Sequence, residues 1–174
     1  QTFLAVGADR VQTEASVFYC DHNTLCVSGE NADDHLFLKT AAARFGVYFS
    51  KPGNGICHFL HCQRFARPGK VMLGADSHTP SSGALGMLAI GSGGLTVAEA
   101  ALGQGFRMNV PKVMGVKLAG RLHPGVTAKD IALELLRQVS VKGGIGYIVE
   151  YCGDGVKELS ISERQTIANM SIEI

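Results

Sequence analysis

Residues 70–80 have the sequence Lys-Val-Met-Leu-Gly-Ala-Asp-Ser-His-Thr-Pro, in which an apolar run gives way abruptly to polar side chains. The apolar part predicts a buried strand, and the polar part begins where that strand ends. Open α/β sheets bind ligands at the carboxyl ends of their strands, which makes this stretch a candidate site. Asp76 and His78 are two residues apart, so they face the same side of an extended loop, with Ser77 between them. The alternative is a loop whose polar side chains only satisfy its own backbone.

Strands and helices are expected to alternate along the whole chain. The apolar patterns predict strands at residues 16–19, 70–73, 112–118 and 142–149, and helices at residues 31–45, 96–102, 127–139 and 160–174. The helix starts carry capping residues, namely Asn31, Thr96 with Glu99, Thr127 with Asp130, and Ser160 with Glu163. This alternation favours an α/β fold with a largely parallel sheet. No linker is visible in residues 1–174, so no internal domain boundary is predicted.

The composition is that of a globular protein without a strong charge bias. Apolar residues make up 46% of the chain, and 16 basic residues nearly balance 15 acidic ones. This balance excludes a disordered chain and argues against a nucleic-acid partner. No apolar run is long enough to span a membrane and no signal peptide is visible, so we expect a cytoplasmic protein with no membrane partner. The five cysteines include no Cys-x-x-Cys pair and predict reduced thiols.

Glycine is strongly overrepresented, with 22 of 174 positions, compared with an average of roughly 7%. These glycines lie among Leu, Ile, Val and Ala, so they are expected to allow close packing inside the fold. The run Gly91-Ser-Gly93-Gly94 is followed by Thr96 where a dinucleotide-binding GxGxxG pattern needs its third glycine, and the chain has no GK[ST] sequence. Nucleotide binding is therefore disfavoured.

Two further polar positions lie at the ends of expected strands. Asp21 and His22 follow the strand at residues 16–19, and adjacent side chains do not easily bond each other. We therefore expect each of them to find a partner elsewhere in the fold, or to form a simple surface turn. Glu150 ends the strand at residues 142–149, where it is either a cap for the next turn or a site group.

The segment Cys57-His-Phe-Leu-His-Cys62 contains residue types that bind metals. If it forms a helix, residues 57 and 61 share one face and residues 58 and 62 share a neighbouring face. The four side chains then do not converge on one point. This spacing favours ordinary packing over a metal site, although His58 could still act singly.

Five stretches together resemble the aconitase family of iron–sulfur hydro-lyases, which includes isopropylmalate dehydratase and homoaconitase large subunits. They occur in family order across most of the chain. The glycine-rich run after Pro80 and the Gly-Gly-x-Gly pattern before Glu150 make the resemblance specific. The stretches are Asp21-His22-Asn23, Gly53-Asn-Gly-Ile-Cys-His58, Gly74-Ala-Asp-Ser-His-Thr-Pro80, Lys142-Gly-Gly-Ile-Gly-Tyr-Ile-Val-Glu-Tyr151 and Arg164-Gln-Thr-Ile-Ala-Asn-Met170.

The resemblance implies three imidazole–carboxylate pairs, which are His22 with Asp21, His58 with Asp76, and His78 with Glu150. The first pair would be the acid that protonates the departing hydroxyl group, and Ser77 would contact the substrate or the cluster. An imidazole beside a carboxylate is held in one tautomer with a raised pKa, which suits proton transfer.

The resemblance also implies a [4Fe–4S] cluster in the complete enzyme. Ala168 occupies the position at which the family is expected to carry a cluster cysteine, and alanine cannot bind iron. The other cluster cysteines, the substrate-binding arginines and the serine base fall in later regions of the family. This chain is therefore expected not to ligate the cluster alone. It is expected to need the remaining C-terminal domains or a second chain, and to be inactive in isolation.

By this resemblance, the chain is the N-terminal portion of a three-layer α/β/α aconitase-like fold, truncated and with a largely parallel sheet. The activity implied is the reversible dehydration of a small-molecule tricarboxylate such as citrate. Specificity for isopropylmalate or homoaconitate is an alternative. A cluster-free binding or regulatory module is another, as is a zinc hydrolase using His58, His61 and a cysteine.

Overall fold

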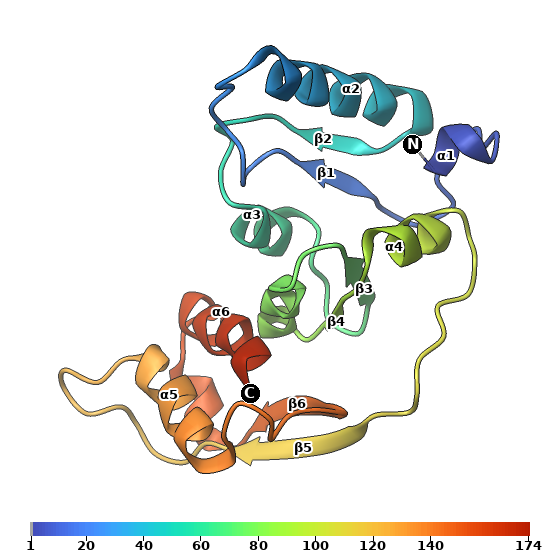
Figure 1. Cartoon of the computed structure of the whole chain (residues 1–174). Coiled ribbons are helices and arrows are strands. Elements are labelled where there is room, and N and C mark those ends of the chain that lie inside the picture. Colours follow the sequence, from blue (N-terminus) through green and yellow to red (C-terminus); the bar gives the residue numbers. More distant parts are fainter. Residues whose placement is uncertain (1) are drawn as a thin grey trace. The chain divides into compact units, whose positions relative to one another are not determined.

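The computed structural model describes residues 2–174, which form two compact units (Figure 1). The first unit runs to Phe65 and also contains Ser92–Phe106. The second unit contains Ala66–Gly91 and Arg107–Ile174. The chain therefore passes from the first unit to the second, back to the first, and again to the second, although its sequence shows no linker.

The first unit is built around one parallel pair of strands. Helix α2 (Gly29–Phe45) connects strand β1 (Val17–Tyr19) to strand β2 (Tyr48–Ser50), and the two strands pair in parallel. Ala42 and Phe45 of α2 form the buried core of this unit with Val47. The remaining helices of the unit are α1 (Thr2–Ala5), α3 (Cys57–Arg64) and α4 (Gly94–Ala101).

The N-cap of helix α2 lies three residues earlier than its sequence predicts. Ser28 is the N-cap, and its hydroxyl oxygen accepts a hydrogen bond from the backbone N–H of Asn31, the residue expected to be the cap. The predicted end of the helix is confirmed. Gly46 has a φ of 72°, a left-handed conformation that terminates helices and favours glycine.

The second unit contains two parallel pairs of strands. Strand β3 (Val71–Gly74) pairs with β4 (Leu88–Gly91) across the 3-10 helix η1 (Thr79–Leu85). Strand β5 (Lys112–Lys117) pairs with β6 (Tyr147–Cys152) across helix α5 (Ala128–Val139). The chain then forms η2 (Asp154–Glu158), α6 (Ile161–Met170) and η3 (Ser171–Glu173). The three strand pairs within residues 2–174 are all parallel, which confirms the predicted α/β class.

Two of the predicted capping boxes are confirmed and one is wrong. The Asp130 carboxylate accepts from the backbone N–H of Thr127 at 2.7 Å, and the Glu163 carboxylate accepts from that of Ser160 at 2.8 Å. Thr96 caps nothing, because α4 begins at Gly94. The last helix also differs from the prediction, since α6 ends at Met170 and a 3-10 turn follows.

Helix α6 packs closely on η1 in the second unit. The Ser81 hydroxyl is buried and lies 2.6 Å from Oδ1 of Asn169 and 2.7 Å from the carbonyl oxygen of His78. Ala168 faces the same contact, because a Cβ added at Gly83 would lie 4.0 Å from the Ala168 Cβ. The small side chain at position 168 therefore has a packing role in this structure.

Gly91 accounts for part of the glycine excess, because it lies against the polar loop that follows β3. A Cβ at Gly91 would lie 2.9 Å from the carbonyl oxygen of Asp76 and 3.4 Å from that of Ser77. Such contacts are too close for a side chain, so the end of β4 and the loop after β3 can approach only because residue 91 is glycine.

Candidate functional site

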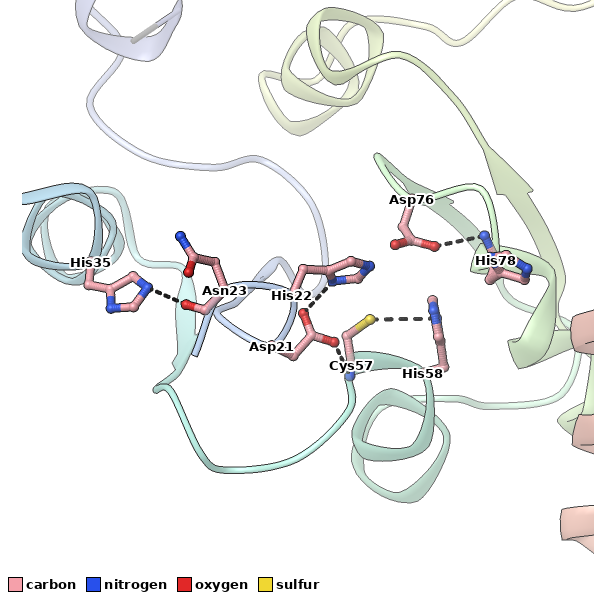
Figure 2. Close-up of polar contacts among 8 residues, drawn as sticks. All are labelled: Asp21, His22, Asn23, His35, Cys57, His58, Asp76 and His78. Carbon is pink, nitrogen blue, oxygen red and sulfur yellow. Dashed lines mark hydrogen bonds and ion pairs between the residues drawn. The ribbon is translucent and has the colours of Figure 1, made fainter. Parts of the chain in front are cut away.

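Asp21 lies at the centre of a polar cluster at the end of β1 (Figure 2). Its Oδ2 accepts a hydrogen bond from the backbone N–H of Cys57 at 2.6 Å, where α3 begins. Its Oδ1 accepts from Nδ1 of His22 at 2.9 Å. The expectation that these adjacent side chains would not bond each other was therefore wrong. The turn after β1 brings the imidazole back against the carboxylate.

The Asp21 carboxyl group is held in its ionised form. Burial by itself raises its pKa, but the hydrogen bonds from Cys57 and the contact with His22 outweigh burial and lower the pKa to about 2. The Asp21 side chain is 7% exposed, whereas the His22 side chain is 71% exposed. A fixed anionic group thus orients an imidazole that is open to solvent.

This low pKa predicts an acid-sensitive contribution to stability. Because the folded-state pKa lies below the ordinary value, the ionised carboxylate stabilises the folded protein by roughly 2 kcal/mol at neutral pH. The contribution is complete above about pH 5 and is lost as the pH falls towards 2. We expect the difference in unfolding free energy between wild type and Asp21→Asn to shrink over this range. Asp33→Asn, at an exposed position of α2, is the matched control.

The two histidines of the Cys57–Cys62 segment have different partners, and the pairing differs from the predicted faces of residues 57 with 61 and 58 with 62. Nδ1 of His58 lies 3.6 Å from Sγ of Cys57. Nδ1 of His61 lies 3.1 Å from the Tyr19 hydroxyl instead, and burial lowers the pKa of His61. Within residues 2–174, no set of three ligating side chains lying within 4.8 Å of one another includes His61 or Cys62. This placement gives no support to a zinc site built on His58 and His61.

The loop after β3 is held by its own hydrogen bonds. Oδ1 of Asp76 accepts from the backbone N–H of His78 at 2.7 Å, and the Thr79 hydroxyl donates to the Asp76 carbonyl at 2.6 Å. The Ser77 hydroxyl lies 3.1 Å from Nδ1 of His78. The Ser77 hydroxyl of this loop thus contacts one side of the His78 ring.

A carboxylate that the sequence did not single out lies on the other side of His78. Nε2 of His78 is 3.6 Å from Oε1 of Glu173 in η3. Glu150 is exposed and lies inside β6, opposite Gly115, so the prediction that it ends a strand over residues 142–149 was wrong. The pairing of His78 with Glu150 stays a prediction. The packing of α6 on η1 explains why Glu173 is nearby, and no local sequence pattern marks this residue.

The third predicted pair joins residues of different units. His58 belongs to the first unit and Asp76 to the second. The pairing of His58 with Asp76 stays a prediction.

Asn23, the last residue of the Asp-His-Asn stretch, accepts a hydrogen bond at its carbonyl from Nε2 of His35 at 2.8 Å. His35 thereby ties the loop after Asp21 to α2.

The chain has five free thiols, and alanine occupies position 168, where the family resemblance places a cluster cysteine. Iron–sulfur clusters are usually held by three or four cysteine thiolates. Alanine cannot supply one, so this position does not fit the expected ligand set.

None of the helices among residues 2–174 combines the length and the apolarity needed to cross a membrane. The names of several relatives place those proteins in mitochondria, which differs from the cytoplasmic location expected for this chain. The location of this chain therefore stays a prediction.

Comparison with known proteins identifies the family. The model of the aconitase family (aconitate hydratase) matches residues 10–174. The chain is 41% identical to the mitochondrial homocitrate dehydratase of Saccharomyces cerevisiae and 40% identical to the mitochondrial aconitate hydratase of the same yeast. Each match covers 99% of this chain and 23% of the relative. A probable mitochondrial aconitate hydratase of Dictyostelium discoideum is 38% identical over 99% of this chain and 24% of its own length. The chain thus spans about a quarter of these relatives, and it belongs to the aconitase family of hydro-lyases.

Proposed function

We propose that this chain supplies proton-transfer groups to a hydro-lyase that removes water from a hydroxy-tricarboxylate such as citrate and adds it back. The observation that carries the proposal is the contact between Asp21 and His22, in which a buried, ionised carboxylate holds an exposed imidazole. Family membership supports the reaction class, and this contact supplies a group able to perform its acid–base step.

Dehydration of a hydroxy acid requires a base that takes a proton from carbon and an acid that protonates the departing hydroxyl. Protonated His22 is suited to the second role. Its Nδ1–H is bonded to Asp21, so the other ring nitrogen, Nε2, is the one that donates to the hydroxyl oxygen. The Asp21 carboxylate stabilises the imidazolium before the transfer. In the reverse direction, neutral Nε2 accepts a proton from water.

The remainder of the site is proposed to lie outside this chain. The relatives are about four times longer, and Ala168 occupies the position at which the family resemblance places a cluster cysteine. The cluster that the family typically uses would then be held by the remaining domains or by a second chain.

The proposal is tested by assaying the complete protein with a panel of acids. Citrate, homocitrate and isopropylmalate are the informative substrates, because two relatives are named for aconitate and homocitrate chemistry. Formation of the carbon–carbon double bond is followed by ultraviolet absorbance. We expect turnover of citrate, and the ratios of kcat/KM among the acids report specificity. Absence of turnover with all of these acids would contradict the proposed function.

A pair of matched variants tests which of two glutamates, Glu173 or Glu150, orients His78. We expect Glu173→Gln in the complete protein to lower kcat by about 10²-fold, because His78 loses the carboxylate that orients Nε2. Glu150→Gln removes the same charge from an exposed position on β6 and is expected to have little effect. The reverse result would favour the pairing of His78 with Glu150 that the family resemblance implies.

A further inference from the structure

We propose that Asp21, His22 and Cys57 form a binding site for a thiophilic divalent cation, of which Zn²⁺ is the representative. The proposal concerns the same surface as the proposed function. Its consequence for turnover rests on that function, because a bound cation would occupy His22 and block proton transfer. The binding itself rests only on the geometry and chemistry of the three side chains.

The three ligand atoms are already close together. One carboxylate oxygen, one imidazole nitrogen and the thiol sulfur all lie within 4.8 Å of one another (Figure 2). A tetrahedral zinc ion with bonds of about 2.0–2.3 Å places its ligand atoms roughly 3.2–3.8 Å apart. The cluster therefore needs to contract by only about 1 Å.

The positions of two ligands are fixed by the fold, and the third can adjust. Asp21 is bonded to the backbone N–H that precedes the Cys57 side chain, so the carboxylate and the thiol are placed by the same contact between β1 and α3. The His22 side chain is 71% exposed, which leaves room for the ring to turn towards a cation. Only the most exposed of the three groups has to move.

The chemistry of the set selects the class of cation. Carboxylate, imidazole and thiolate are the three ligand types of zinc sites, and three protein ligands leave a fourth position for water. The thiolate favours zinc or cadmium over magnesium or calcium, which prefer oxygen. On binding, the cation takes the place of the proton on Nδ1 of His22, which passes through solvent to Nε2 so that the ring stays neutral, and the Cys57 thiol releases its proton to solvent. The two negative charges of Asp21 and Cys57 then balance Zn²⁺.

His58 lies beside Cys57 but outside the group of three ligand atoms, so the fourth position is left to water. The Nδ1 atom of His58 lies 3.6 Å from the Cys57 sulfur. His61 contacts the Tyr19 hydroxyl instead and takes no part. This assignment differs from the zinc set considered from sequence, in which His58 and His61 act together.

The test measures zinc binding to the complete protein by equilibrium dialysis with elemental analysis. Cys57→Ser is compared with Cys62→Ser, which removes an equally buried thiol from the same helix. We expect Cys57→Ser to weaken the tightest additional Zn²⁺ site at least 10²-fold and Cys62→Ser to leave it unchanged. Equal zinc affinity in wild type and Cys57→Ser would overturn the proposal.

Two further measurements keep the test valid if Cys57→Ser fails to fold. In wild type, Cd²⁺ should produce a thiolate-to-metal charge-transfer absorbance that Mg²⁺ does not. His22→Gln alters only an exposed side chain and should weaken cadmium and zinc binding about 10-fold or more. Cadmium binding without the charge-transfer band, or undiminished in His22→Gln, would overturn the site. Zinc bound through Cys57 with unchanged turnover would support the site and contradict the role of His22, so the two proposals fail separately.

Discussion

Replacing His22 with alanine in the complete protein is expected to lower kcat by about 10²–10⁴-fold, which is the usual contribution of a positioned general acid or base. KM for the hydroxy acid is expected to change much less, because the proposed role of His22 is proton transfer and not substrate binding. The imidazole is mostly exposed, so its removal should leave the fold intact.

The pH dependence of kcat provides the second readout for His22. The wild-type profile should contain a limb that reports the ionisation of this imidazole, and the limb should be absent from His22→Ala. His123→Ala, which removes an exposed histidine elsewhere, is the matched control and should retain wild-type activity. Wild-type kcat in His22→Ala would contradict the assignment of Asp21 and His22 as the acid.

Replacing Phe45 with alanine is expected to destabilise the first unit by about 3–5 kcal/mol. The Phe45 ring is 4% exposed, lies at the end of α2, and packs against Phe3 with ring centroids 5.2 Å apart. Truncation removes the transfer free energy of the ring and leaves a cavity beside Ala42 and Val47. Because α2 connects β1 to β2, loss of this packing should also loosen the end of β1 that precedes Asp21.

Unfolding of the complete protein, followed by circular dichroism against denaturant or temperature, measures this effect. Phe59→Ala is the matched control, since Phe59 lies on α3 and is 52% exposed. It should change the free energy of unfolding by less than about 1 kcal/mol. Equal effects of the two substitutions would show that the cluster around Phe45 does not stabilise the unit.

The secondary structure followed from local patterns wherever one residue type dominates the local energetics. Apolar runs located β1, β3 and β5, and the boxes at Thr127 and Ser160 located two helix starts. Prediction failed where two candidates compete within one turn. Ser28 and Asn31 are both good caps, and the structure uses Ser28. The capping pattern at Thr96 does not mark a helix start, because α4 begins two residues earlier at Gly94.

The candidate site was predictable in part. Asp21, His22, Asp76 and His78 were visible because polar residues follow apolar strands. The contact of Asp21 with the Cys57 backbone was not, since it joins residues 36 positions apart through the start of a helix. Glu173 was missed for the same reason, because it reaches His78 only through the packing of α6 on η1.

The sequence by itself determined the α/β class, the parallel pairing that such alternation favours, and the residue types available for acid–base chemistry. Local propensity, capping and hydrophobic periodicity act over a few residues, and they are written in the chain in order. The tertiary structure decided which groups meet. It brought the Asp21 carboxylate to the backbone N–H of Cys57, and Glu173 to the His78 ring. Both contacts depend on how helices pack against strands and on one another. No local pattern records that packing.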